Sequence, residues 1–135
     1  KTIGLGVDII QNKRIKTSIK NKNFVNRIFG KIEIENSKKI LNKTSYFAKR
    51  FAAKESLMKS IGTGFRDGMN FKDIQILNNE LGKPYYLLSK KLKNFIFKKK
   101  RIKNFELFLS ISDEKDYSIA FTILQLRKWL IKKLY

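Results

Sequence analysis

The 135-residue sequence contains no cysteine, no histidine and a single proline. The missing cysteines and histidines exclude disulfide bonds, zinc sites built from these residues, thiol nucleophiles and a Ser-His-Asp triad. Any metal ion that side chains hold must therefore have oxygen ligands, and proton transfer must use carboxylates, lysines, tyrosines or bound water. The absence of cysteine also fits a reducing compartment.

Acidic residues are scarce, since 11 Asp and Glu stand against 31 Lys and Arg, which gives a formal net charge of +20. This charge predicts an anionic partner: nucleic acid, an acidic membrane surface, a phosphate-rich ligand or an acidic protein. Long apolar runs are missing too, because no segment approaches the roughly 20 residues that span a bilayer. The start KTIGLGVDII also lacks the features of a secretory signal. We therefore expect a cytoplasmic protein without stable membrane insertion.

The composition nevertheless predicts a folded chain, and we expect one domain over residues 1–135. Apolar residues make up 42% of the sequence and include 11 Phe and 5 Tyr, which argues against disorder. The segment TIGLGVDII predicts a short strand that ends at Asp8, with Gly4 and Gly6 allowing a turn or the close approach of a ligand. Residues 12–40 are basic and amphipathic, which predicts short helices.

The longest predicted helix begins at a cap formed by Thr44 or Ser45 and ends at Gly62. Four residues after Phe51, its apolar stripe meets Glu55, a carboxylate on the face expected to be buried. Burying a carboxylate costs several kcal/mol unless it is paired, protonated or bound to a cation. Two interpretations stay open here: an ion pair with Lys59, or an Mg²⁺ ion held jointly with Asp8.

Basic residues surround Glu55, and a glycine turn follows the helix. This arrangement can offer ammonium, guanidinium and backbone N–H donors to phosphate oxygens. The basic side chains are Lys49, Arg50, Lys54 and Lys59, and the turn is Gly62-Thr63-Gly64.

The second half of the chain predicts two hairpins separated by a lysine-rich helix. FKDIQIL and PYYLL flank a turn, FELFLSIS and YSIAFTILQL flank another, and Ser89 caps the helix between them. Leu92, Phe95 and Ile96 form the buried side of this helix, and Leu107, Leu109 and Ile111 share one face of the last hairpin. The order of elements predicts an α+β fold with a largely antiparallel sheet.

Four segments, GLGVDI, AKRFAAKESLMKSIGTG, ELGKP and LSISDEKDYSIAFTIL, together resemble the holo-acyl carrier protein synthase family. The resemblance implies the 4′-phosphopantetheinyl transferase fold, with a long central helix and smaller basic helices packed with the sheet. It also implies transfer of 4′-phosphopantetheine from coenzyme A to a serine of apo-acyl carrier protein, in fatty acid biosynthesis. Adenosine 3′,5′-bisphosphate is then the second product.

The same resemblance assigns roles to individual residues. It makes Asp8 and Glu55 the Mg²⁺ ligands and Lys59 the catalytic lysine that stabilises the pyrophosphate, while the proton acceptor stays open between Glu55 and a metal-ordered water. The residues implied for the coenzyme A cleft are Arg50, Gly62, Thr63, Gly64, Lys83, Pro84, Ser110 and Ser112. Those implied for docking the acidic carrier protein are Arg14, Phe24, Arg27 and Ile28.

Short members of this family form homotrimers with the cleft between protomers, which implies an interface that includes Phe121 or Trp129. Some members also carry histidines on the last hairpin, before and after the serine, where this chain has Leu109 preceded by Phe108, and Asp113. Two other interpretations of the residues remain: a small nucleic-acid-binding protein, or a basic domain on anionic membranes. Both explain the net charge but give no role to Asp8 or Glu55, so we expect no nucleic-acid partner.

Overall fold

The structure is a computed structural model, which describes residues 1–65 and 68–127. In chain order its elements are β1 (Thr2–Gln11), α1 (Asn12–Ser18), α2 (Lys22–Ile28), α3 (Lys31–Ser37), α4 (Lys43–Ile61), the 3₁₀ helix η1 (Phe71–Asp73), β2 (Ile74–Asn78), β3 (Pro84–Leu88), α5 (Lys90–Lys100), β4 (Phe105–Asp113) and β5 (Tyr117–Leu126). Among the described residues, no helix is both long enough and apolar enough to cross a membrane.

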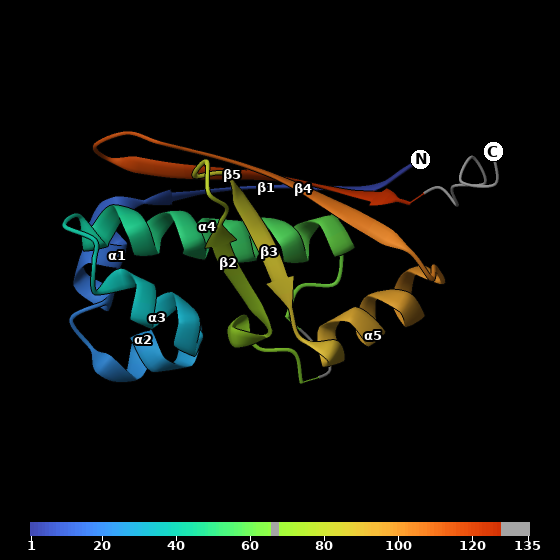
Figure 1. Ribbon diagram of the computed structural model, residues 1–135, viewed down its shortest axis with the longest axis horizontal. Helices are drawn as coiled ribbons and strands as arrows, with labels where there is room; N and C mark the ends of the chain where they lie inside the picture. The colour runs from blue at the N-terminus through green and yellow to red at the C-terminus, as the bar shows by residue number, and fades with distance from the viewer. Residues whose placement is uncertain (66–67, 128–135) are drawn as a thin grey trace.

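A three-stranded antiparallel sheet packs along α4, the long central helix (Figure 1). The strand order is β1-β5-β4, and β2 pairs with β3 as a separate antiparallel hairpin that contacts α4. Figure 1 shows α1, α2 and α3 near the beginning of α4 and α5 near its end. The predicted α+β class, the antiparallel pairing and both hairpins are confirmed.

Two glycines allow β1 to lie directly against α4. A Cβ atom on Gly4 would lie 1.8 Å from the carbonyl oxygen of Ser60, and one on Gly6 would lie 1.9 Å from that of Ser56. The expectation of a turn or a ligand at these glycines was therefore wrong, because the space is filled by the helix backbone. The strand is also longer than predicted, and Asp8 lies inside it rather than at its end.

The ends of α4 follow from local capping. The Asn42 side chain accepts a hydrogen bond from the Ser45 backbone N–H over 3.0 Å, so the predicted cap at Thr44 or Ser45 was wrong. Gly62 ends the helix as predicted, with a left-handed φ of 89° that favours glycine. Ser89 caps α5 as predicted, by accepting from the Leu92 N–H.

A buried ion pair ties α3 and β2 to α4. The Lys54 Nζ lies 2.6 Å from the Glu33 Oε1, and both side chains are fully buried. Lys54 also donates to the carbonyls of Phe71 and Ile74, while Glu33 accepts from the Ile76 N–H. Each charge is therefore compensated inside the core. Sequence reasoning placed Lys54 among possible phosphate contacts, and this burial shows that the assignment was wrong.

Candidate active site

Asp8, Glu55 and Lys59 form a polar cluster where β1 meets α4. Asp8 shares the helix-facing side of β1 with Gly6 and Ile10, because side chains alternate along a strand. The Lys59 Nζ lies 3.1 Å from the Asp8 Oδ1 and donates to the Val7 carbonyl over 3.0 Å. The lysine side chain is 55% exposed, so its ammonium is open to solvent as well as to the aspartate.

The environment of Glu55 favours a bound cation. Partial burial raises the pKa of the Glu55 carboxyl above its usual range, the nearby Asp8 charge raises it further, and Lys59 opposes both effects. The negative charges of Asp8 and Glu55 therefore repel each other. The pair is matched to an ion such as Mg²⁺, which typically takes one or two protein carboxylates and fills its other positions with water and phosphate oxygens.

Glu55 does not need Lys59 as its ion-pair partner in this arrangement. The Lys59 ammonium donates to Asp8 on β1, rather than to Glu55, the residue four positions earlier on the helix that the sequence offered as its partner. Within residues 1–65 and 68–127 no group of three or more acidic side chains gathers as a metal site. Asp8 and Glu55 therefore fit a divalent ion whose remaining ligands come from elsewhere, and they fit it as a pair.

Arg50 lies on a different side of α4, in a cavity of about 440 Å³. The cavity is lined by residues that include Lys39, Asn42, Tyr46, Lys49, Arg50 and Asn78. Arg50 and Glu55 are five residues apart, which in a helix corresponds to about 140° of rotation and about 7.5 Å of rise. Arg50 therefore faces β2 whereas Glu55 faces β1, so the structure does not join them in one cluster.

The Arg50 guanidinium is buried and held by neutral groups. It is 6% exposed, lies 3.6 Å from the centre of the Tyr46 ring, and donates to the Asn78 Oδ1 over 2.6 Å and to the Tyr46 carbonyl over 3.3 Å. Burial lowers the pKa of Arg50 from its ordinary value. No carboxylate in the described part of the chain bonds to it. An uncompensated buried cation that borders a cavity suits an anionic ligand.

The turn between β2 and β3 adjoins the Arg50 cavity. Asn78 donates from Nδ2 to the Gly82 carbonyl over 2.9 Å, next to Lys83 and Pro84, which were expected at the coenzyme A cleft. Sequence reasoning missed Asn78, because an asparagine before a turn is common turn composition and does not point to a ligand.

The glycine turn lies at the other end of α4. Gly62 and Gly64 both have positive φ, 89° and 67°, and the Thr63 Oγ1 donates to the Gly64 carbonyl. This turn follows Lys59 by less than one helical turn. The expected cleft residues are thus divided along α4, since Arg50 precedes Glu55 and Lys59 and the glycine turn follows them.

Ser110 and Ser112 face away from this cluster. In the sheet, Ser110 lies beside Phe121, which lies beside Val7, so these residues share the side of the sheet opposite to α4. Asp8 pairs with the fully buried Ala120 on the helix side. One protomer therefore does not bring either serine to its own carboxylate pair.

The outer side of the sheet is apolar and exposed. Its large exposed side chains, between 39% and 61% accessible, are Leu5, Val7, Ile9, Phe108, Tyr117, Ile119 and Phe121. A contiguous patch of this kind usually marks an interface. Phe121, which was expected at an interface between protomers, is one of these exposed side chains, while Trp129 lies outside the described residues.

The residues expected to dock the carrier protein differ in accessibility. Arg14 and Arg27 are exposed, and Phe24 is half-buried, stacking on Phe51 with ring centres 6.4 Å apart. Ile28 is only 3% exposed and belongs to the core. The docking role expected for Ile28 was therefore wrong, because the apolar face of α2 packs inward.

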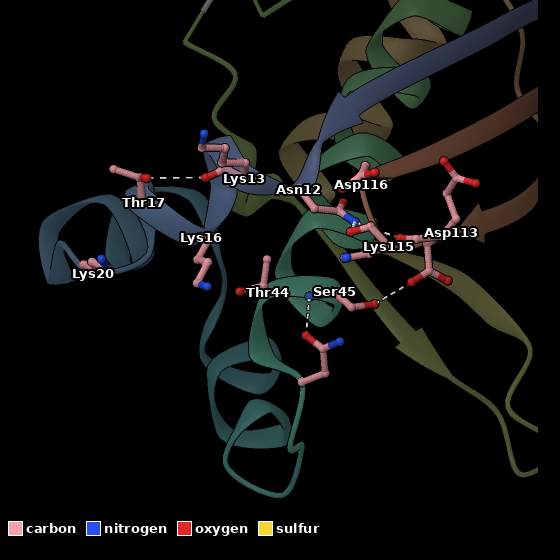
Figure 2. Close-up of a pocket in the computed structure, with 12 residues that line it drawn as sticks. Asn12, Lys13, Lys16, Thr17, Lys20, Thr44, Ser45, Asp113, Lys115 and Asp116 are labelled. Atoms are coloured by element: carbon pink, nitrogen blue, oxygen red, sulfur yellow. Dashed lines mark hydrogen bonds between the residues drawn. The ribbon is translucent and has the colours of Figure 1, made fainter.

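Figure 2 shows a larger cavity, of about 710 Å³, between α1, the beginning of α4 and the turn after β4. Its charged lining residues are Lys13, Lys16, Lys20, Asp113, Glu114, Lys115 and Asp116. Ser45 donates to the Asp113 Oδ2 over 2.6 Å, which joins α4 to that turn. Because both signs of charge line the cavity, it does not favour an anion as the Arg50 cavity does.

Comparison with known proteins places this geometry in a family. Residues 4–122 match the model of the 4′-phosphopantetheinyl transferase superfamily. The chain is 54% identical over 125 residues to the holo-[acyl-carrier-protein] synthase of Pelagibacter ubique, an alignment covering 93% of this chain and 98% of that protein.

Solved structures of holo-[acyl-carrier-protein] synthases share the fold of this chain. The holo-[acyl-carrier-protein] synthase of Neisseria meningitidis superposes with a TM-score of 0.82 at 34% identity, covering 93% of this chain and 99% of the other. The synthase from Bacillus anthracis, solved in complex with CoA (3′,5′-ADP), superposes with a TM-score of 0.77 at 30% identity, covering 93% and 98%. The similarity thus extends through both sequence and fold.

Proposed function

Because the chain belongs to the 4′-phosphopantetheinyl transferase superfamily, as a holo-[acyl-carrier-protein] synthase, we propose that Asp8, Glu55 and Lys59 are the centre of its reaction. The enzyme transfers the 4′-phosphopantetheine group of coenzyme A to apo-acyl carrier protein, in fatty acid biosynthesis. The observation that carries the proposal is the pair of neighbouring carboxylates beside an exposed lysine.

Asp8 and Glu55 hold Mg²⁺ in this proposal. Their mutual repulsion is relieved by a divalent ion, and the carboxylate pair leaves positions on that ion for water and phosphate oxygens. When bound, the ion supplies positive charge to the pyrophosphate of coenzyme A. A bound cation would explain why the Glu55 carboxylate lies on the otherwise apolar face of α4.

Lys59 stabilises the leaving group. The serine oxygen of the carrier protein forms a bond to the β-phosphorus, and the bond from that phosphorus to the bridging oxygen breaks, releasing adenosine 3′,5′-bisphosphate. Negative charge grows on the oxygens of the departing phosphate. Asp8 holds the Lys59 ammonium at 3.1 Å, and the exposed side chain leaves further N–H donors for those oxygens.

Arg50 binds a phosphate group of the nucleotide half of coenzyme A. Its buried charge has no carboxylate partner among the described residues, and it borders a cavity with Lys39 and Lys49. Lys83 and Pro84, on the adjoining turn, complete this end of the cleft. Gly62, Thr63 and Gly64 line the end beyond Lys59. Gly62 and Gly64 turn the chain there with positive φ, and the Gly62 N–H donates to the Met58 carbonyl, so the backbone donors proposed for the substrate are those of Thr63 and Gly64.

Self-association completes the cleft. Ser110 and Ser112 lie on the outer side of the sheet with the apolar patch, so they reach a carboxylate pair only in a neighbouring protomer. Covering the patch would also remove exposed apolar side chains from water. These two observations support the homotrimer, with each cleft between two protomers.

Arg14 and Arg27 dock the carrier protein. Both are exposed on the basic segment at the beginning of the chain, and Arg27 lies over the Phe24 ring at 6.0 Å. Opposite charge on the carrier protein would steer its approach and fix its orientation. The net charge of +20 then has a protein partner, and binding of nucleic acid, which explains the charge alone, is not expected.

Intact-protein mass spectrometry tests the function. Apo-acyl carrier protein incubated with this enzyme, coenzyme A and Mg²⁺ gains the mass of one phosphopantetheine, and EDTA prevents the gain. Transfer at the full rate in EDTA would overturn the metal site but not the transferase activity. The cytoplasmic location and the single domain over residues 1–135 stay predictions, which cell fractionation and a single cooperative unfolding transition would test.

A further inference from the structure

Asn78 connects the buried arginine with the turn between β2 and β3. Its Oδ1 accepts a hydrogen bond from the Arg50 Nη2 over 2.6 Å, and its Nδ2 donates to the Gly82 carbonyl over 2.9 Å. An arginine only donates and a carbonyl only accepts, so the Asn78 Oδ1 must face Arg50 and the Nδ2 must face the Gly82 carbonyl. Both ends of the side chain are used, and no carboxylate could make both bonds.

The neutrality of Asn78 matters for the charge of Arg50. The guanidinium is oriented on three sides by uncharged groups: the Tyr46 ring, the Tyr46 carbonyl and the Asn78 amide. The nearby Glu33 carboxylate is neutralised by Lys54 at 2.6 Å. Arg50 therefore keeps its full charge for a ligand, while its geometry is already set before the ligand binds.

The same amide couples that geometry to the turn. Asn79 folds the turn by accepting from the Leu81 and Lys83 N–H groups, both over 2.9 Å. Asn79 has no bond to Arg50, so the turn itself does not require the arginine. In the described part of the chain, Asn78 is the side chain that hydrogen-bonds to both, so it links the Arg50 guanidinium to the turn that carries Lys83.

We propose that Asn78 is a positioning residue for coenzyme A: it orients Arg50 toward the nucleotide phosphate, keeps the guanidinium charge uncompensated, and holds the turn that carries Lys83 beside it. The inference rests on the proposed role of Arg50 as a coenzyme A contact. It makes Asn78 a determinant of affinity for the nucleotide half of the substrate, and leaves the chemistry at Asp8 and Glu55 untouched.

Asn78→Asp is the most informative variant, since it keeps the shape and the acceptor for Arg50 but adds a competing negative charge and removes the donor to Gly82. We expect the KM for coenzyme A to rise about tenfold or more, as for the loss of one charged hydrogen bond. The kcat and the KM for carrier protein should stay within about twofold. Asn79→Asp is the matched control, because it adds the same charge one residue away and keeps two acceptor oxygens for the turn.

Calorimetry with adenosine 3′,5′-bisphosphate as the probe provides a readout that does not depend on turnover. Asn78→Asp should weaken its binding by a similar factor, and Asn79→Asp by less than about twofold. In a double-variant cycle, Arg50→Gln and Asn78→Asp together should be no weaker than Arg50→Gln alone, because Asn78 acts through Arg50. Thermal unfolding of each variant verifies that the fold is retained.

These experiments distinguish a failure of the Asn78 role from a failure of the Arg50 role on which it depends. If Arg50→Gln leaves coenzyme A binding unchanged, the proposed role of Arg50 fails, and the inference fails with it. If Arg50→Gln weakens binding while Asn78→Asp behaves like Asn79→Asp, only the role of Asn78 is overturned. Additive losses in the double variant would likewise contradict action through Arg50.

Discussion

At the scale of single residues, two neighbouring charged side chains on α4 differ in burial and in pairing. Lys54 is fully buried and paired with Glu33, whereas Glu55, the next residue, is half-buried beside Asp8. One helical step therefore separates a charge that stabilises the core from a charge that is available to a ligand. This difference gives distinct expectations for substitution at the two positions.

Lys54→Met should mainly affect stability. It leaves Glu33 buried with backbone donors but without a counter-ion, which costs about 3 to 5 kcal/mol in comparable cases. Chemical denaturation measures the change in the free energy of unfolding. Replacing both partners, as Lys54→Met with Glu33→Leu, should restore part of the loss, and a single variant that unfolds like the unmodified protein would show that the pair contributes little.

Lys59→Met should mainly affect catalysis. The exposed ammonium would be lost from the leaving group, so kcat should fall by roughly 10²-fold or more, as for other single groups that stabilise transition-state charge. The free energy of unfolding should change by less than about 1 kcal/mol, since an exposed ion pair contributes little. Steady-state kinetics measures the effect, and an unchanged kcat would exclude Lys59 from the reaction.

Arg14→Glu tests the docking surface. Reversing an exposed charge at a steered interface should raise the KM for carrier protein by about tenfold while leaving the KM for coenzyme A within about twofold. High salt should reduce the difference between the variant and the original enzyme. Equal changes in both KM values would contradict a docking role confined to the carrier protein.

At the scale of elements, the contact between β1 and α4 sets the position of Asp8. Helix and strand backbones touch at Gly4 and Gly6, and Asp8 follows on the same side of the strand. The depth of this contact fixes how far the Asp8 carboxylate lies from Glu55 and Lys59. Small residues in the strand are thus part of the construction of the site.

Gly6→Ala should push the strand away from the helix. The added Cβ would lie 1.9 Å from the Ser56 carbonyl oxygen, and overpacking of this kind costs about 1 to 3 kcal/mol. We expect lower stability together with a lower transfer rate, whereas Gln11→Ala, at the exposed end of the same strand, should change neither by much. A Gly6→Ala protein with unaltered stability and rate would contradict the tight contact.

Most elements were predictable because their signals are local. Ser89 and Gly62 are strong caps, and alternation in residues 105–126 specifies a hairpin. The contacts of Gly4 and Gly6 with α4 were not predictable from the sequence. Glycines that contact a distant helix look the same in the local sequence as glycines that form a turn. Asn42 was missed as the cap of α4 because Thr44 and Ser45 are equally good capping residues.

At the scale of the whole molecule, the two sides of the three-stranded sheet differ, since one packs against a helix and the other is exposed. One side packs on α4 and carries Asp8, and the other exposes an apolar patch beside Ser110 and Ser112. The sequence predicted Asp8 and Glu55 as a pair through the family resemblance. It did not separate Arg50 from that pair or place Ile28 in the core, because both depend on which helix face meets the rest of the fold.

Phe121→Lys should dissociate the proposed homotrimer. A charge in the centre of the outer apolar patch disfavours its burial, so sedimentation or light scattering should show a smaller particle, and transfer activity should fall with it. Leu81→Lys provides the control, since Leu81 is 95% exposed but lies on the turn between β2 and β3. An unchanged particle size for Phe121→Lys would exclude this face as the interface.

The most direct test of the proposed metal site compares Glu55→Gln with the original enzyme. Each is incubated with apo-acyl carrier protein, coenzyme A and Mg²⁺, and the carrier protein is analysed by intact-protein mass spectrometry. Glutamine keeps the size of the side chain but removes the negative charge with which Glu55 is proposed to hold Mg²⁺ beside Asp8. We expect a phosphopantetheine gain with the original enzyme and almost none with Glu55→Gln, while thermal unfolding and particle size are the same for both proteins. Full transfer by Glu55→Gln would contradict the proposed metal site at Asp8 and Glu55.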